Sequence, residues 1–195
     1  FGKLATLRKL DSRLQRHPTT HEHLEGIRIA SGSLGQGMSV AIGAAYAKKL
    51  NKDNSTVYVL MGDGEQQEGQ VWEAATFAPH HEMDNLIAFI DLNGQQIDGP
   101  TVKVMNNRDL GAKYSAFGWE VISVEDGNDM AAVVKGVKEA KSKLGQGKPV
   151  MVLLHTGMGY GVDFMMGSHK WHGVAPNDAQ LAEALGQLEE TLGDY

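Results

Sequence analysis

The sequence contains no cysteine, which excludes disulfide scaffolds, zinc–thiolate sites and thiol nucleophiles. Long apolar runs are also missing, since none approaches the ~20 residues that cross a bilayer as a helix. The first residues, FGKLATLRKLD, lack the apolar centre of a signal peptide. Positive charge is in deficit, with a formal net charge of −6, so no overall field attracts nucleic acid. We therefore expect neither nucleic acid nor a membrane among the partners.

The residues that are present describe a globular chain. A hydrophobic fraction of 42% with 22% charged residues is typical of folded proteins. A length of 195 residues suits one α/β domain and is too short for two ordinary ones, so we predict a single domain over 1–195. Glycine is frequent, at 24 residues, and its clusters predict loops that approach a ligand closely, or ordinary tight turns. The clusters lie at 26–43, 62–69, 94–99 and 157–173.

Apolar strands alternate with helical patterns along the chain. Strands are expected at 56–61, 85–91, 119–124 and 149–155. Helices are expected at 4–14 (stopped by Pro18), 33–50 (capped by Ser33), 66–79, 107–118, 129–144 and 177–192. Because each strand is apolar throughout, this order predicts an α/β fold, a doubly wound parallel sheet with helices on both faces.

Polar residues follow the first two predicted strands. Gly62-Asp63-Gly64 comes after the first, and Asn93 comes after the second, 30 residues beyond Asp63. In open parallel sheets ligands bind beyond the carboxyl ends of the strands, and a right-handed crossover places two such ends on one edge. A carboxylate and an amide oxygen are hard ligands, which suit magnesium or calcium. We therefore predict a divalent cation at Asp63 and Asn93.

The glycines on either side of Asp63 predict a second ligand. Gly62 and Gly64 let backbone amides approach a diphosphate, and a predicted helix begins just after them. A Gly-Asp-Gly turn alone is equally consistent with a structural turn. Its combination with an Asn-Gly after the next strand is considerably more specific.

Together these residues resemble the fingerprint of thiamine diphosphate enzymes, and their surroundings resemble the diphosphate-binding domain of transketolase. Five stretches match in family order and cover nearly the whole chain. They are GIRIASGSLGQGMSVAIGAA (26–45), GDGEQQEGQVWEAATFA (62–78), NLIAFIDLNGQQIDGPT (85–101), YSAFGWEVISVEDGND (114–129) and GMGYGVDFMMGSHKWHGVAP (157–176). The sequence is most similar to split transketolases, in which this half is encoded separately.

The resemblance implies the thiamine diphosphate-binding fold, a thiamine diphosphate cofactor and a Mg²⁺ (or Ca²⁺) ion. Asp63 and Asn93 would bind the metal by their side chains, and Gln95 would bind it by its backbone carbonyl. Gly64, with Gly62 beside it, would donate its amide to the diphosphate. The other matched cofactor-binding positions are Gly32, Leu34, Met158 and His172.

The resemblance also implies residues near the reacting centre. His172, in WHG, matches a histidine near the diphosphate and that centre, and His17, in LQRHP, matches a histidine that contacts the sugar donor. Glu68 matches a glutamate at the subunit interface that helps to link paired active sites. Two positions depart from the family pattern: Leu92 replaces a common Asn or Asp, and Arg16 replaces a glycine.

The implied activity is that of transketolase, the transfer of a two-carbon ketol unit from a ketose phosphate to an aldose phosphate. The chain matches only the diphosphate side. The resemblance therefore implies a C-terminal transketolase subunit with the pyrimidine-binding domain, in a homodimer or heterotetramer, without which the chain is inactive. The family's most N-terminal segment is expected to be missing from 1–195, and residence is expected in the cytoplasm.

Three alternatives are open. The first is a related thiamine diphosphate enzyme, either 1-deoxyxylulose-5-phosphate synthase or the α subunit of a 2-oxo acid dehydrogenase, although SGSLGQG and WHG favour transketolase. The second is a non-catalytic cofactor-binding subunit, and the third is a nucleotide-binding domain. The GMGYG loop does not favour NAD, because it follows the last strand and lacks an acidic partner. The clusters His21-Glu22-His23 and His80-His81-Glu82 favour a transition metal only weakly, since no third ligand matches them.

Overall fold

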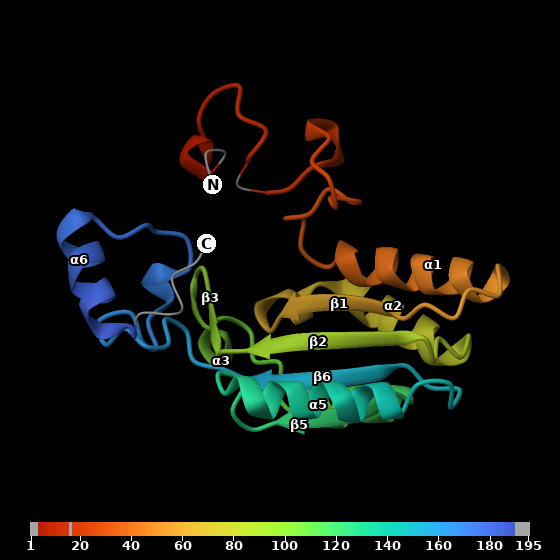
Figure 1. Ribbon diagram of the computed structural model, residues 1–195. Helices are drawn as coiled ribbons and strands as arrows, with labels where there is room; N and C mark the ends of the chain where they lie inside the picture. The colour runs from red at the N-terminus through yellow and green to blue at the C-terminus, as the bar shows by residue number, and fades with distance from the viewer. Residues whose placement is uncertain (1–3, 16, 190–195) are drawn as a thin grey trace.

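The computed structural model describes residues 4–15 and 17–189. At its centre is a parallel sheet with the strand order β1-β2-β6-β5 (Figure 1). The strands are β1 (Val57–Gly62), β2 (Leu86–Leu92), β5 (Glu120–Val124) and β6 (Val150–His155). All four predicted strands are present, and the prediction of a doubly wound α/β fold is confirmed.

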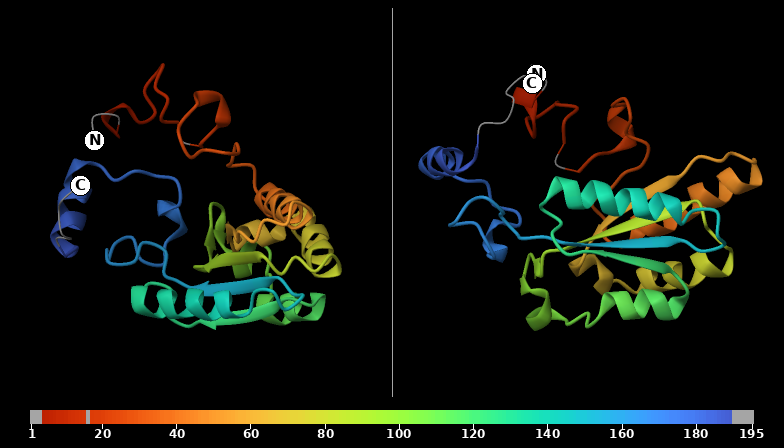
Figure 2. Two further views of the ribbon diagram at one scale, coloured as in Figure 1. Left: turned by 45° about the vertical axis from the view of Figure 1, so that its right-hand side comes forward. Right: turned by 60° about the horizontal axis from the view of Figure 1, so that its bottom comes forward.

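Helices lie on both faces of the sheet, as Figure 2 shows. They are α1 (Gln36–Leu50), α2 (Gly69–His80) and α4 (Leu110–Phe117) on one face and α5 (Met130–Ser142) on the other. Successive residues of a strand point to opposite faces, so Leu86 and Ile90 of β2 enter the core under the first three helices, whereas Ile87 enters the core under α5. β2 is apolar on both sides because both of its sides are covered.

The expectation that every strand is buried on both sides is wrong for β1. Tyr58 is 49% exposed and Leu60 is 68% exposed, whereas Val57 and Val59 pack on the core under α1. β1 lies at the edge of the sheet, and α5 packs on β5 and β6. One side of β1 therefore carries apolar side chains that no helix in the described part of the chain covers.

The helix predicted over 4–14 does not form in the described residues of that segment. Only a 3-10 turn, η1 (Leu4–Thr6), is present. Arg8 has a left-handed backbone (φ 62°), which prevents a right-handed helix from continuing. Apolar spacing stabilises a helix mainly when its face is buried, and Leu10 is 93% exposed.

The other predicted helices form with shifted ends. α1 begins at Gln36 rather than near Ser33, because Gly35 has a φ of 81° and lies outside helical geometry. The predicted helix over 66–79 is divided into η3 (Gly64–Gln67) and α2. The last predicted helix ends at Gln187 and not at 192, because Leu188 has an extended backbone (φ −88°, ψ 135°). The remaining elements are η2 (Thr20–Glu22), β3 (Gln95–Gln96), β4 (Gly99–Pro100), α3 (Thr101–Val104), η4 (His169–Trp171) and α6 (Asp178–Gln187).

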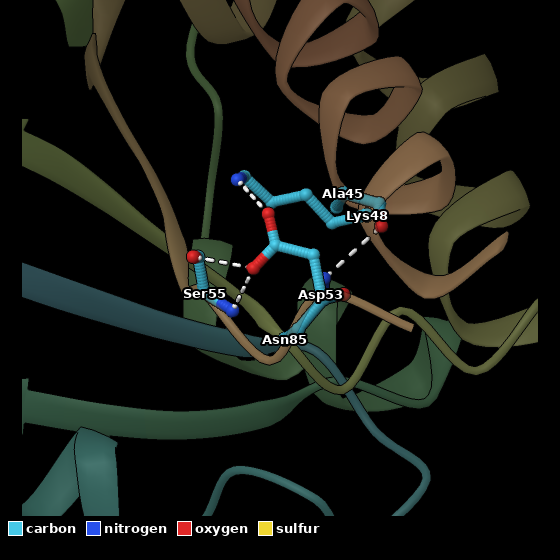
Figure 3. Close-up of polar contacts among 5 residues, drawn as sticks. All are labelled: Ala45, Lys48, Asp53, Ser55 and Asn85. Carbon is cyan, nitrogen blue, oxygen red and sulfur yellow. Dashed lines mark hydrogen bonds and ion pairs between the residues drawn. The ribbon is translucent and has the colours of Figure 1, made fainter. Parts of the chain in front are cut away.

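One carboxylate fixes the turn from α1 to β1 at the amino end of the sheet (Figure 3). Asp53 accepts hydrogen bonds from the N–H and the hydroxyl of Ser55 (2.8 and 2.5 Å) and pairs with Lys48 (2.7 Å). The bond from Lys48, together with those from Ser55, lowers the pKa of Asp53. On the next strand, Asn85 donates to the Ala45 carbonyl (3.0 Å). These contacts anchor the amino ends of β1 and β2 to α1.

The opposite, carboxyl end of the sheet faces the β3–β4 hairpin and the segment that carries η4 and α6 (Figure 1). α1 begins at this same end, where the chain from the N-terminus reaches it. Loops from several parts of the sequence therefore gather beyond the carboxyl ends of the strands. Within residues 4–15 and 17–189, no helix has the length and apolar character needed to cross a membrane.

Candidate functional site

The structure brings Asp63 and Asn93 together at the carboxyl ends of β1 and β2. Gly62 stands opposite Asp91 in the register of the two strands, and the Asp63 N–H donates to the Asp91 carbonyl (3.2 Å). The Asp63 carboxylate accepts a hydrogen bond from the N–H of Gly94, the residue after Asn93 (Oδ2···N 2.7 Å). The two residues therefore lie on adjacent loops that one hydrogen bond joins directly.

Asp63 is a buried carboxylate, only 4% exposed. Its partners are backbone groups, since Oδ1 accepts from the Gly64 N–H (2.7 Å) and Oδ2 accepts from Gly94. Burial raises the pKa of Asp63, the two N–H donors oppose this shift, and the Asp91 carboxylate adds to it. None of the ion pairs in the described residues involves Asp63. A buried carboxylate beside a second one, with no cationic side chain paired to it, favours a bound cation.

The nitrogen and the oxygen of the Asn93 side-chain amide form hydrogen bonds with two different residues. Its Nδ2 donates to Oδ2 of Asp91 (3.3 Å), and its Oδ1 accepts from the Gln95 N–H (2.9 Å). Gln95 is opposite Pro100 in the two-stranded β3–β4 hairpin, which the sequence did not predict. This hairpin fixes the backbone of the residue whose carbonyl is the expected third metal ligand.

Glu65 ties the glycine turn after β1 to the loop before α1. Its Oε2 accepts from the Gly62 N–H (3.2 Å), and its Oε1 accepts from the Gly35 N–H (2.8 Å). Gly35 is the N-cap of α1 and has no side chain to cap the helix. Glu65 therefore provides an acceptor and a negative charge at this helix N-terminus.

Gly32 and Leu34 line a cleft that also contains Glu65. The cleft lies between the segment 28–34, α1 and the edge of β1. Gly32 has a φ of +105°, and a Cβ there would lie 2.5 Å from Cγ of His17. The imidazole of His17 thus packs directly on the Gly32 backbone, which groups two of the expected site residues at one point.

The loop after β6 carries Met158 and His172. Met158 is half-buried, and its carbonyl accepts from the Gly167 N–H (3.0 Å). His172 is exposed and directly follows η4, which packs against β4 of the hairpin. His172 therefore lies on the segment next to the hairpin, and no hydrogen bond within the described residues joins its ring to Asp63.

Glu68 is exposed at the N-cap of α2, where its side chain does not cap the helix. Its Cβ lies 2.8 Å from the place that a Cβ would take at Gly35, so it adjoins the loop before α1. Leu92, which departs from the family pattern, is half-buried at the end of β2 and packs on the core. Arg16, the other departure, lies outside the described residues.

Three polar residues of the site have no role in the prediction from the sequence. They are Glu65, Asp91 and Asn107, which donates from the loop after α3 to the Asp63 carbonyl (2.6 Å). Asp91 has a recognisable signal, because it is a charged residue that closes an apolar strand. Glu65 and Asn107 have none, since the bonds from the Gly35 N–H to Glu65 and from Asn107 to the Asp63 carbonyl span 30 and 44 residues of the chain.

Neither histidine cluster forms a metal site in the described residues. No group of three or more His, Asp or Glu side chains within 4–15 and 17–189 is arranged to hold a metal ion. His81 lies instead among aromatic rings, with centroid distances of 4.0 Å to Phe77 and 5.7 Å to Tyr46. A transition-metal function therefore gains no support from these residues.

The residues at the carboxyl edge fit a hard divalent cation and a diphosphate. Asp63, Asn93 and the Gln95 carbonyl offer only oxygen atoms, which Mg²⁺ and Ca²⁺ prefer. The side-chain oxygen of Gln95 is buried and has no hydrogen-bond partner among the described residues. No atom lies within 4 Å of the place that a Cβ would occupy at Gly62, so bare backbone faces open space there.

The chain is similar to transketolases in sequence. Residues 1–191 match the family described as "Transketolase, thiamine diphosphate binding domain". An apulose-4-phosphate transketolase subunit of Phocaeicola vulgatus is 38% identical over 187 residues, which cover 96% of this chain and 65% of that protein. The "6-deoxy-6-sulfo-D-fructose transketolase subunit SqwG" of Clostridium sp. is 42% identical over 165 residues, which cover 85% and 59%. The chain thus spans less than two thirds of the length of both relatives.

Solved transketolases share the fold. The crystal structure of transketolase from Campylobacter jejuni has a TM-score of 0.85 at 32% identity and covers 95% of this chain and 29% of that one. The transketolase from Leishmania mexicana has a TM-score of 0.85 at 31% identity, with 94% of this chain and 28% of that one covered.

Proposed function

We propose a function from one premise: the chain belongs to the transketolase family, in which it corresponds to the thiamine diphosphate-binding domain. In this proposal Asp63, Asn93 and the Gln95 carbonyl hold a Mg²⁺ (or Ca²⁺) ion that anchors the diphosphate of thiamine diphosphate. Together with a partner chain, the domain transfers a two-carbon ketol unit from a ketose phosphate to an aldose phosphate.

The observation that carries the proposal is the environment of Asp63. Its carboxylate is buried, receives two backbone N–H groups, and lies near a second carboxylate. Hydrogen bonds from N–H groups hold such a carboxylate in place but leave its charge in a poorly solvated position. A divalent cation compensates this charge and at the same time binds phosphate oxygens.

The glycine turn and the loop before α1 would meet the cofactor. Gly64 would donate its amide to the diphosphate, and Gly62 exposes bare backbone beside it. Gly32 and Leu34 open onto one cleft, and Met158 follows β6 at the same end of the sheet. These positions come from three separate loops, so only the folded chain brings them together.

When bound, thiamine diphosphate supplies the carbanion chemistry that breaks and forms the carbon–carbon bonds. The residues of this chain bind and orient the reactants. His17, packed on Gly32, would donate a hydrogen bond to the sugar donor. His172, exposed after η4, would hold or move a proton near the reacting centre. Glu68, exposed beside Gly35, would contact the partner.

The proposed partner is a C-terminal transketolase subunit that carries the pyrimidine-binding domain. Two relatives are named as transketolase subunits, which supports a divided enzyme. We propose a homodimer or heterotetramer in the cytoplasm as the working assembly. Turnover of a ketose phosphate with ribose 5-phosphate should require the partner, and full activity of the isolated chain would contradict this part of the proposal.

Cofactor titration tests the cation site. Thiamine diphosphate is titrated calorimetrically into the complex of the full chain with its partner, with Mg²⁺ and then with EDTA. Binding should depend on Mg²⁺, and both Asp63→Ala and Asn93→Ala should weaken it while leaving the fold intact by circular dichroism. Asp98→Ala, at an exposed site in the β3–β4 turn, is the matched control. Unchanged binding in both site variants would contradict the metal assignment.

A further inference from the structure

Asp91 is the penultimate residue of the otherwise apolar strand β2 and is not among the proposed metal ligands or cofactor-binding residues. It is half-buried and contacts residues at the ends of β1, β2 and β6. Its carbonyl accepts from the Asp63 N–H (3.2 Å). Its Oδ2 accepts from Asn93 Nδ2 (3.3 Å), and its Oδ1 accepts from the Thr156 hydroxyl. One side chain therefore joins two of the loops that form the site.

We propose that Asp91 is a positioning residue: its carboxylate orients the Asn93 amide so that the oxygen, and not the nitrogen, is available to a divalent cation. This inference rests on the function proposed above, because it assumes that Asn93 binds the cation by Oδ1.

The chemistry of an amide beside a carboxylate supports this role. The two ends of an asparagine amide have nearly the same shape, but one only donates and the other only accepts. A carboxylate only accepts, so Asp91 binds Nδ2 and excludes the opposite orientation of Asn93. Oδ1 of Asn93 is thereby turned away from Asp91, to the side where the Gln95 N–H lies (2.9 Å). Without Asp91, only the Gln95 N–H distinguishes the two ends of the amide, so the orientation that presents an oxygen ligand is held less firmly.

Thr156 holds Asp91 in this orientation. Its hydroxyl binds Oδ1 of Asp91, so Oδ2 is left for Asn93. Its N–H donates to the Leu92 carbonyl (3.4 Å), which fixes the backbone of the loop after β6 against the end of β2. Both oxygens of Asp91 accept hydrogen bonds from side chains of the site, and in this proposal the carboxylate acts through Asn93 rather than as a metal ligand.

A double-mutant cycle tests the proposal. The apparent dissociation constant of Mg²⁺ is measured at a fixed thiamine diphosphate concentration in the partner complex, with Asp91→Ala made both in the natural sequence and in Asn93→Ala. Partners that orient metal ligands typically contribute about 10- to 100-fold to metal affinity, and we expect a loss of that size from Asp91→Ala alone. In the Asn93→Ala background the same change should have a much smaller effect, because only the electrostatic contribution of the carboxylate is left to lose.

Two conservative variants complete the test. Asp91→Asn should restore most of the Mg²⁺ affinity, because its amide oxygen accepts the same bond from Asn93. Thr156→Val should weaken Mg²⁺ binding in the natural sequence and should leave it unchanged in the Asn93→Ala background. If Asp91→Ala does not fold, Thr156→Val takes its place in the double-mutant cycle.

Two results would overturn the positioning role alone. One is an equal loss from Asp91→Ala in both backgrounds, as expected of a merely structural residue. The other is a loss in Asp91→Asn as large as in Asp91→Ala, as expected of a direct, charged ligand. An unaltered Mg²⁺ affinity in Asn93→Ala itself would overturn the proposed function as well, so the two failures are distinguishable.

Discussion

The Asp63 carboxylate and the Gly94 backbone N–H are joined by a hydrogen bond of 2.7 Å, although they lie 31 residues apart in the sequence. This bond fixes the loop that carries Asn93 against the end of β1. Because the donor is a neutral backbone group, the bond positions the carboxylate without neutralising it. The same contact thus holds the proposed ligands together and preserves the negative charge that a cation requires.

Glu65→Ala should loosen the turn after β1 and the start of α1 together. It removes the acceptor of both the Gly62 and the Gly35 N–H groups, and we expect a loss of about 1–2 kcal/mol in the free energy of unfolding. Urea denaturation measures this loss, and amide hydrogen exchange should accelerate at both glycines. Glu65→Gln keeps one acceptor oxygen, so its free energy of unfolding should lie between those of Glu65→Ala and the natural protein. Unchanged exchange at both amides would contradict the link.

Gly32→Ala should displace the ring of His17. The new Cβ would lie 2.5 Å from Cγ of His17, and the backbone φ of +105° is unfavourable for alanine. The imidazole resonances of His17 should shift in NMR spectra. Gly26→Ala is the matched control, since Gly26 also has a positive φ (+87°) but has no atom within 4 Å of the Cβ position. Equal effects of both variants on His17 would show that backbone strain, and not contact, is responsible.

Tyr114→Phe should destabilise the protein from within the core. The Tyr114 hydroxyl donates to Oε1 of Gln66 (2.6 Å), both side chains are fully buried, and Gln66 donates in turn to the Gly62 carbonyl (3.1 Å). The unpaired Gln66 oxygen should cost about 1–3 kcal/mol in the free energy of unfolding. Tyr160→Phe, at a residue 60% exposed, should change this free energy by less than about 0.5 kcal/mol. Equal values for the two variants would contradict the buried network.

Burial and the nearby Glu65 carboxylate raise the pKa of Tyr114, so its hydroxyl stays protonated in the folded state at alkaline pH. A raised pKa means that the contribution of this group to stability is complete below the unfolded value, near 10, and is lost as the pH rises from there through the folded value. The tyrosinate absorbance that Tyr114→Phe removes should appear in the natural folded protein only above the unfolded value near 10. Appearance of this absorbance near pH 10 in the folded protein would contradict this prediction.

Asp84 should contribute to the acid sensitivity of the fold. Burial opposes its ionisation, but the Lys49 ammonium (2.8 Å) and the Gly147 N–H (3.1 Å) outweigh burial and lower the pKa of Asp84. A lowered pKa gives stability that is complete above the unfolded value, near 4, and is lost as the pH falls through the folded value. Asp84→Asn should therefore reduce the free energy of unfolding at pH 6, as measured by urea denaturation. Below pH 4, this free energy should fall less steeply with decreasing pH in Asp84→Asn than in the natural protein. Exposed Asp98→Asn is the control, and parallel pH curves for the natural protein and Asp84→Asn would refute the prediction.

The strands and their polar ends could be predicted from the sequence because these signals are local. Apolar runs identified each strand, and a Gly-Asp-Gly turn followed by an Asn-Gly after the next strand indicated where the loops meet. The prediction of a helix over 4–14 was wrong because the spacing of leucines does not show whether the fold offers a surface that buries them. Leu10 is almost fully exposed as a result.

The hydrogen-bond partners within the site could not be predicted, since they depend on tertiary contacts. Glu65 looks like an ordinary surface residue until the fold places Gly35 beside it. The β3–β4 hairpin is only two residues long on each side, too short for a periodic pattern. The exposed side of β1 was also missed, because an apolar run does not show whether a strand lies at the edge or the centre of a sheet.

Anomalous diffraction from crystals of the partner complex grown with Mn²⁺ and thiamine diphosphate tests the central claim most directly. Mn²⁺ shares the preference of Mg²⁺ for oxygen ligands and scatters anomalously. The account predicts one strong peak that contacts the side-chain oxygens of both Asp63 and Asn93. Bound thiamine diphosphate with the peak elsewhere, or with no metal at these two side chains, would contradict it.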